Sequence, residues 1–221
     1  MKTAKFFTMI LAAVFVFAHA VGGAFAANER DALHYAEMPK CVEEKTGTEF
    51  LAVIKNESEN FCVGTGLRIQ YIFVEVYAAA FYIDKNAIAE LKNHKGNLAK
   101  EIAEGDFPRI IVMKFLMDVS VNKLKERFLV GLKQTMPNPS QKTKNELNSF
   151  LDTLKDVKKG EEISIYFGYY VAGEMKKNLV ATKNFVVDNK ELSVGLLYLW
   201  FDDRPASPDL KKNVLKNLGG K

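Results

Sequence analysis

Apolar and polar positions along the chain follow two periods, one typical of strands and one typical of helices. Strand-like stretches alternate or run apolar between turn residues, and helix-like stretches repeat apolar residues three and four positions apart. The ranges expected as strands are 40–56 (one or two strands around a turn at Thr46-Gly47), 61–83, 109–118, 161–171 and 174–187 (one or two strands). The ranges expected as helices are 85–104, 121–134, 140–156, 190–201 and 207–218.

Local signals mark where several of these elements begin or break. Side chains that accept hydrogen bonds from a first helical turn precede three helices. These N-cap residues are Ser120, Ser207, and Asp188 or Asn189. We expect Gly96 to break a helix, and Gly64-Thr65-Gly66 to break a strand with a bulge or a tight turn. The order of elements predicts an α+β fold, a single domain in which helices cover one face of an antiparallel β-sheet.

Residues 1–26 have the three parts of a secretory signal peptide. MKTAK supplies two positive charges, residues 6–18 are an apolar core, and Ala24-Phe25-Ala26 places small residues at a cleavage site. We expect cleavage after this segment, leaving residues 27–221 as one domain exported to the periplasm. The alternative is an uncleaved anchor over residues 6–27, whose length approaches that of a membrane span.

The charge balance gives no sign of a nucleic-acid-binding surface. The chain has 31 Lys and Arg against 27 Asp and Glu, a formal charge of +4. The leader carries two lysines, so the mature charge is 29 − 27 = +2. Acidic and basic residues are interspersed, and we therefore expect no nucleic acid partner. Membrane contact is expected only through a leader that stays uncleaved.

Signatures of metal binding and nucleophilic catalysis are sparse. Without the leader, the histidines are His34 and His94, and with Cys41 and Cys62 they lack the spacing of a zinc site. Neither histidine stands beside a nucleophile signature. We expect no metal, no cofactor and no catalytic residue. In an exported protein Cys41 and Cys62 could form one disulfide, and the alternative is two free thiols.

One charged residue stands out inside the most apolar stretch. Between residues 67 and 83 almost every side chain is apolar or aromatic, yet Arg68 lies within this run. An unpaired charge removed from water costs several kcal/mol. Arg68 therefore faces solvent, forms a buried ion pair with a residue such as Glu75, or binds an anion in a pocket.

Three segments resemble the chalcone isomerase-like superfamily. They are GTGLR followed by VEVYAAAFYID, then MKFLMDVSVNKLKERFLVGL, then LSVGLLYLWFDDRPASPDLKKNVL. The resemblance covers about residues 60–217 with the motifs in the family's order. It implies an antiparallel sheet with helices packed on it and a ligand cleft between them.

The resemblance also implies a candidate site. Arg68 matches the family's cleft arginine. The polar positions that the true isomerases use for catalysis are changed in this chain, where they hold Tyr77, Ser120, Arg127 and Leu199. An arginine paired with a tyrosine is what the fatty-acid-binding branch uses to hold a carboxylate. The ligand-binding residues expected from the resemblance are Arg68, Tyr77, Ser120 and Arg127.

Three functions remain open from the sequence. The first is a non-catalytic binder of a small amphipathic carboxylate such as a fatty acid, and it requires the chain to fold back between Tyr71 and Val74 so that Arg68 meets Tyr77. The second is an isomerase acting on a chalcone-like aromatic substrate. The third is an envelope interaction protein without a ligand, whose cleft would be filled by aromatic side chains. The candidates for that filling are Phe73, Phe81 and Phe115.

Overall fold

The computed structural model describes residues 40–70, 73–171 and 173–220. The predicted signal peptide, residues 1–26, and His34 lie outside the described residues. None of the described helices is long and apolar enough to cross a membrane.

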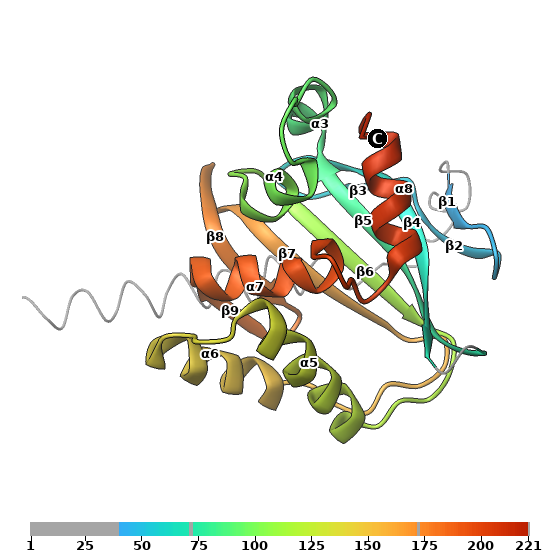
Figure 1. Ribbon diagram of the computed structural model, residues 1–221, viewed down its shortest axis with the longest axis vertical. Helices are drawn as coiled ribbons and strands as arrows, with labels where there is room; N and C mark the ends of the chain where they lie inside the picture. The colour runs from blue at the N-terminus through green and yellow to red at the C-terminus, as the bar shows by residue number, and fades with distance from the viewer. Residues whose placement is uncertain (1–39, 71–72, 172, 221) are drawn as a thin grey trace, which may run out of the picture. The chain divides into compact units, whose positions relative to one another are not determined.

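The centre of the fold is a seven-stranded antiparallel sheet whose strands follow one another in chain order from β3 to β9 (Figure 1). Its strands are β3 (Val53–Lys55), β4 (Glu59–Gln70), β5 (Val74–Asp84), β6 (Arg109–Phe115), β7 (Glu162–Val171), β8 (Glu174–Thr182) and β9 (Phe185–Asp188). A separate hairpin is formed by β1 (Lys40–Glu43) and β2 (Thr48–Leu51). Each residue range that the sequence predicts as strand overlaps at least one of these observed strands.

Helices cover one face of this sheet, as the sequence predicts (Figure 1). They are α3 (Lys85–Lys92), α4 (Leu98–Glu104), α5 (Val121–Thr135), α6 (Gln141–Asp152), α7 (Lys190–Phe201) and α8 (Pro208–Asn217). The main core lies between them and side chains that alternate along the strands, such as Ala79, Phe81 and Ile83 of β5. The expected caps are confirmed, because Ser120, Asn189 and Ser207 each accept a hydrogen bond from the first turn of a helix.

The break expected at Gly64-Thr65-Gly66 takes the form of a bulge: β4 continues through these residues, but its register with β5 shifts between Cys62 and Gly64. The glycines serve the packing of α8 against β4. A Cβ atom at Gly66 would lie 2.1 Å from the backbone nitrogen of Leu210, and one at Gly64 would lie 2.8 Å from that of Val214. No side chain fits in this space. The glycines therefore allow a helix near the end of the chain to lie directly on the strand.

The chain folds back between β4 and β5, as convergence of Arg68 and Tyr77 requires. The two strands pair antiparallel, and Arg68 is the register partner of Tyr77. The pairing is irregular next to this pair, between Arg68 and Ile69. Two side chains nine positions apart in the sequence are thus neighbours across the hairpin.

The β1–β2 hairpin packs against the second face of the sheet. Phe50 of β2 joins a smaller core with residues of β4, β5 and β6, including Leu67 and Tyr82. The Sγ atoms of Cys41 and Cys62 lie 2.03 Å apart, as in a disulfide between β1 and β4.

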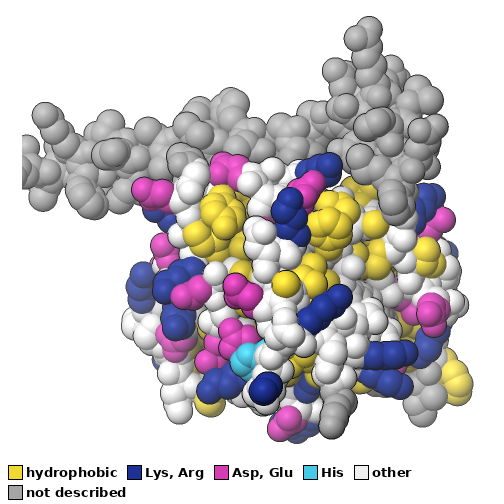
Figure 2. Space-filling model, turned by 90° about the horizontal axis from the view of Figure 1, so that it is seen from above, with side chains coloured by type: hydrophobic (Ala, Val, Ile, Leu, Met, Phe, Trp, Pro, Cys, Tyr) yellow, Lys and Arg dark blue, Asp and Glu magenta, His cyan; other side chains and the backbone are white. Residues whose placement is uncertain are grey.

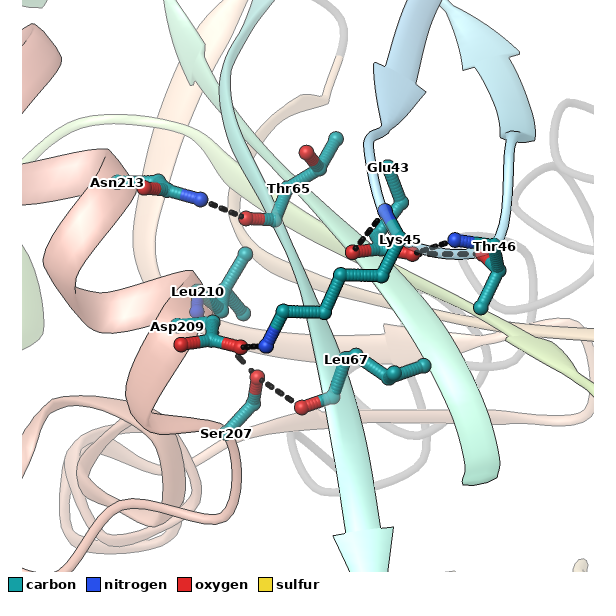
Figure 3. A network of polar contacts seen from close by, with 9 residues as sticks. All are labelled: Glu43, Lys45, Thr46, Thr65, Leu67, Ser207, Asp209, Leu210 and Asn213. Carbon is teal, nitrogen blue, oxygen red and sulfur yellow. Dashed lines mark hydrogen bonds and ion pairs between the residues drawn. The ribbon is translucent and has the colours of Figure 1, made fainter. Parts of the chain in front are cut away.

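A polar network connects the same hairpin to α8 (Figure 3). Lys45 in the β1–β2 turn forms an ion pair of 2.6 Å with Asp209 at the start of α8. Ser207 donates a hydrogen bond to the carbonyl oxygen of Leu67, and Asn213 donates one to that of Thr65. The start of α8 is therefore held by both the hairpin and β4, beside Arg68.

Candidate ligand-binding site

A cavity of about 750 Å³ lies between the sheet, α5 and the end of α7. Its sheet wall includes Val76, Met113 and Phe115, and its helix wall includes Leu124 and Phe128 of α5. Cavities that hold small ligands are roughly 300–1,000 Å³ and mostly apolar with a few polar groups. This cavity has that character.

Arg68 is half-buried and lines the cavity. Its Nη1 donates a hydrogen bond to the carbonyl oxygen of Ala206, between α7 and α8. Among the described residues no carboxylate forms an ion pair with it, and Glu75, the partner considered from the sequence, is exposed. A guanidinium carries five N–H donors. Arg68 therefore keeps donors that the protein's own carboxylates do not use.

Tyr77 lines the same cavity, and its hydroxyl is hydrogen-bonded to Trp200, which also lines it. Nε1 of Trp200 donates a hydrogen bond to the Tyr77 hydroxyl oxygen over 3.3 Å. Burial raises the pKa of Tyr77, and the opposing effects of Trp200 and Arg68 are smaller. The phenol is therefore neutral at physiological pH, and since its oxygen already accepts a hydrogen bond from Trp200, its own O–H is free to donate one.

The other two predicted ligand-binding residues also line this cavity. Ser120 is the N-cap of α5, and its hydroxyl accepts a hydrogen bond from the Lys123 backbone nitrogen. Arg127 lies nearly two turns further along α5 and is exposed. Leu199, at the position where the true isomerases have a threonine or serine, contributes an apolar surface. All four changed positions of the resemblance thus meet in one cavity.

The three aromatic residues proposed to fill the cleft leave it open. Phe73 points into solvent, with 86% of its surface exposed. Phe81 packs edge-on against Phe201, with ring centroids 4.8 Å apart. Phe115 forms part of the wall, 5.7 Å from the Tyr77 ring.

Sequence reasoning missed several polar residues of the cavity. Trp200 is a core residue, 2% exposed, and its indole N–H donates the hydrogen bond that holds the Tyr77 hydroxyl. Lys123 and Arg204 line the cavity from α5 and from the segment after α7. Helical spacing with Arg127 could have indicated Lys123, because residues four apart share a helix face. No sequence signal links Trp200 to Tyr77, since that contact joins distant parts of the chain.

A second hollow of about 640 Å³ lies beside α3 and α4. Figure 2 looks at this end of the molecule and shows acidic side chains gathered next to a histidine. The hollow's titratable lining includes Asp84, Glu90, His94, Glu101, Glu104 and Asp106. In the part of the chain that the structure describes, no group of three or more such residues is arranged to hold a metal ion.

Part of this acidic charge compensates a buried cation. Arg109 is 2% exposed, and burial lowers its pKa to about 10, while Asp106 and Glu101 act in the opposite direction. The acidic residues therefore have a role in keeping Arg109 charged inside the protein.

Comparison with known proteins gives a family and a fold. A family model described as chalcone isomerase-like matches residues 44–216. No curated protein sequence matches the chain. Among solved structures 37 chains match, including the crystal structure of a fatty-acid binding protein from Arabidopsis thaliana. That match has a TM-score of 0.64 at 17% sequence identity and covers 82% of this chain and 98% of the other, so it shows the shared fold.

Proposed function

This chain belongs to the chalcone isomerase-like family, and we propose that it is a non-catalytic binder of a small amphipathic carboxylate such as a fatty acid. The observation that carries the proposal is the Arg68–Tyr77 pair at the wall of an apolar cavity. The fatty-acid binding title of the Arabidopsis thaliana protein supports the same reading.

The chemistry of the pair suits a carboxylate. Arginine offers a planar fork of donors that matches two carboxylate oxygens, and hydrogen bonds to a charged group contribute about 1.5–3 kcal/mol. The neutral phenol of Tyr77 supplies a further donor. An alkyl chain in the apolar part of the cavity would add ~0.8 kcal/mol for each buried methylene. Head group and tail thus have separate places in one site.

Binding is favoured over isomerisation by the residues that surround this pair. The positions that carry catalytic polar groups in the true isomerases hold Tyr77, Ser120, Arg127 and Leu199 here. All four line the cavity, so the change affects the site itself and not a remote surface. Leu199 in particular replaces a hydroxyl with an apolar group that suits an alkyl tail.

The proposal places the binder outside the cytoplasm. Residues 1–26 have the pattern of a signal peptide, and export to the periplasm would bring Cys41 and Cys62 into an oxidising compartment. An exported carrier with a disulfide is consistent with both features.

The proposal is tested by identifying what co-purifies with the protein. The full chain is expressed with its leader, purified without detergent and examined by native mass spectrometry and solvent extraction. We expect a carboxylate-bearing lipid in the wild type and in Lys212→Ala, an exposed charge removed from α8, but not in Arg68→Ala. A wild-type protein that is empty and also fails to bind added fatty acids would refute the proposal.

A further inference from the structure

Large apolar side chains are exposed around the mouth of the cavity. Phe73, next to the β4–β5 turn, is the most exposed of them at 86%. Val74, Met117 and Val130 follow at 37%, 39% and 47%, and all three line the cavity. Monomeric proteins seldom gather exposed apolar side chains at one place without a binding role.

The topology places three of these residues, Phe73, Val74 and Met117, at one end of the sheet, and Val130 lies further along α5 on the same cavity. Tyr77 of β5 pairs with Phe115 of β6, so the start of β5 and the end of β6 lie at the same end of the sheet. Helix α5 begins shortly after β6, and Figure 1 shows the end of β4, the start of β5 and the β6–α5 connection at that end. We call Phe73, Val74, Met117 and Val130 the apolar rim.

Cationic side chains accompany the apolar rim. Lys123, Arg127 and Arg204 are exposed and line the same cavity. Within the described residues none of the three forms an ion pair. Two carboxylates line the cavity, Asp118 and Asp202. Asp118 is already paired with Lys158 over 3.0 Å, so only Asp202 is left to balance the three cations. The mouth therefore combines apolar groups with an excess of unpaired positive charge.

We propose that the apolar rim docks on the surface of a lipid bilayer containing anionic lipids, so that ligand passes between membrane and cavity. Apolar groups flanked by Lys and Arg are the pattern of surfaces that lie in a membrane interface. This inference rests on the proposed function for its ligand. It also departs from the sequence expectation, in which only an uncleaved leader would contact a membrane.

A bilayer fits this surface better than a protein partner does. A stable protein interface buries roughly 800 Å² on each side and has a packed apolar core. The apolar rim has four side chains, of which only Phe73 stands mostly clear of the protein surface. A single protruding aromatic residue suits insertion among lipid chains, which need no complementary shape.

Vesicle binding by matched variants tests the docking surface. The full-length protein is mixed with vesicles of phosphatidylcholine alone or with phosphatidylglycerol, and bound protein is measured by flotation. We expect stronger binding to the anionic vesicles, and a roughly tenfold loss in Phe73→Ser. The control is Val186→Ser on β9, which removes an apolar residue that is 38% exposed but does not line the cavity. Every variant has the same N-terminus, so a retained leader contributes equally to all.

Equal vesicle binding by Phe73→Ser and Val186→Ser would overturn the proposal, and so would wild-type binding that ignores the anionic lipid. A second measurement distinguishes a failure of the membrane-docking proposal from a failure of the proposed function. Affinity for decanoate, measured without vesicles, should be unchanged in Phe73→Ser, while transfer of decanoate from vesicles should slow about tenfold. If no variant bound decanoate, the proposed function would be refuted. The docking surface would then be tested by the vesicle-binding result alone.

Discussion

Tyr77 lies directly opposite Arg68 in the pairing of β4 with β5, and the indole N–H of Trp200 donates a hydrogen bond to the Tyr77 hydroxyl. The sheet brings the first two residues together, and α7 contributes the third. Because Trp200 occupies the phenol oxygen, the phenol proton is directed to another acceptor. In the proposed function, that acceptor is a ligand carboxylate beside Arg68.

Removal of the Tyr77 hydroxyl should weaken ligand binding without abolishing it. In Tyr77→Phe the carboxylate loses one hydrogen bond and Trp200 loses its acceptor, so we expect an affinity about 5- to 10-fold lower, or about 1 kcal/mol. A titration of decanoate, followed by the fluorescence of Trp200, measures this directly, because Trp200 is the chain's only tryptophan. Unchanged affinity would remove Tyr77 from the site.

A methyl group at Gly66 should destabilise the protein strongly. In Gly66→Ala the new Cβ would meet the Leu210 backbone, which forces α8 away from β4 and should cost about 3 kcal/mol. The neighbouring Thr65→Ala serves as the control, since it loses only a 3.0 Å hydrogen bond to the Val42 carbonyl oxygen, worth about 1 kcal/mol. Urea unfolding measures both. Equal stability of the two variants would contradict the packing of α8 on β4.

The disulfide between Cys41 and Cys62 should form in an oxidising compartment and stabilise the protein. The two residues are 21 positions apart, and closing a loop of that size contributes roughly 3 kcal/mol. We expect the intact mass to rise by about 2 Da after reduction, and thermal unfolding to shift downward in the Cys41→Ser, Cys62→Ser double variant. Two thiols that react with an alkylating reagent in the freshly isolated native protein would contradict this prediction.

Buried tyrosines should make the protein sensitive to alkaline pH. Burial raises the pKa of Tyr166 to about 12 and raises that of Tyr82 as well. The folded protein thus holds these protons more tightly than the unfolded chain, whose tyrosines titrate near 10. Stability from this source is complete below pH 10 and is lost as pH rises towards 12.

The alkaline effect can be assigned by substitution. Unfolding free energies at about pH 9 and about pH 11 should differ less in Tyr166→Phe than in the wild type, because a phenylalanine has no proton to lose. Identical pH dependence in the two proteins would show that Tyr166 does not contribute.

The elements that depend on local rules could be predicted from the sequence. Ser120 and Ser207 satisfy the first turn of a helix with their own side chains, and Gly96 separates two short helices. These features involve neighbouring residues only, which is why periodicity and capping residues locate them. The layering of helices on one sheet face follows from the same patterns.

What the sequence concealed depends on contacts between distant segments. Gly64-Thr65-Gly66 looks like a break because the helix that makes small residues necessary lies near the end of the chain. The segment between β4 and β5 lacks the usual turn residues, so the sequence does not predict that the chain folds back there. The pairing of Arg68 with Tyr77 is seen only in the structure. The role of Trp200 required the packing of α7 beside the sheet.

If Arg68 selects a carboxylate ligand, the cavity should distinguish two ligands that differ only in the head group. Decanoate and decanol have the same chain length and differ in the head group, and Trp200 fluorescence reports both from inside the cavity. We predict that the wild type binds decanoate at least about tenfold more tightly than decanol, and that Arg68→Ala binds the two alike. Equal wild-type affinity for decanoate and decanol would show that Arg68 does not select a carboxylate.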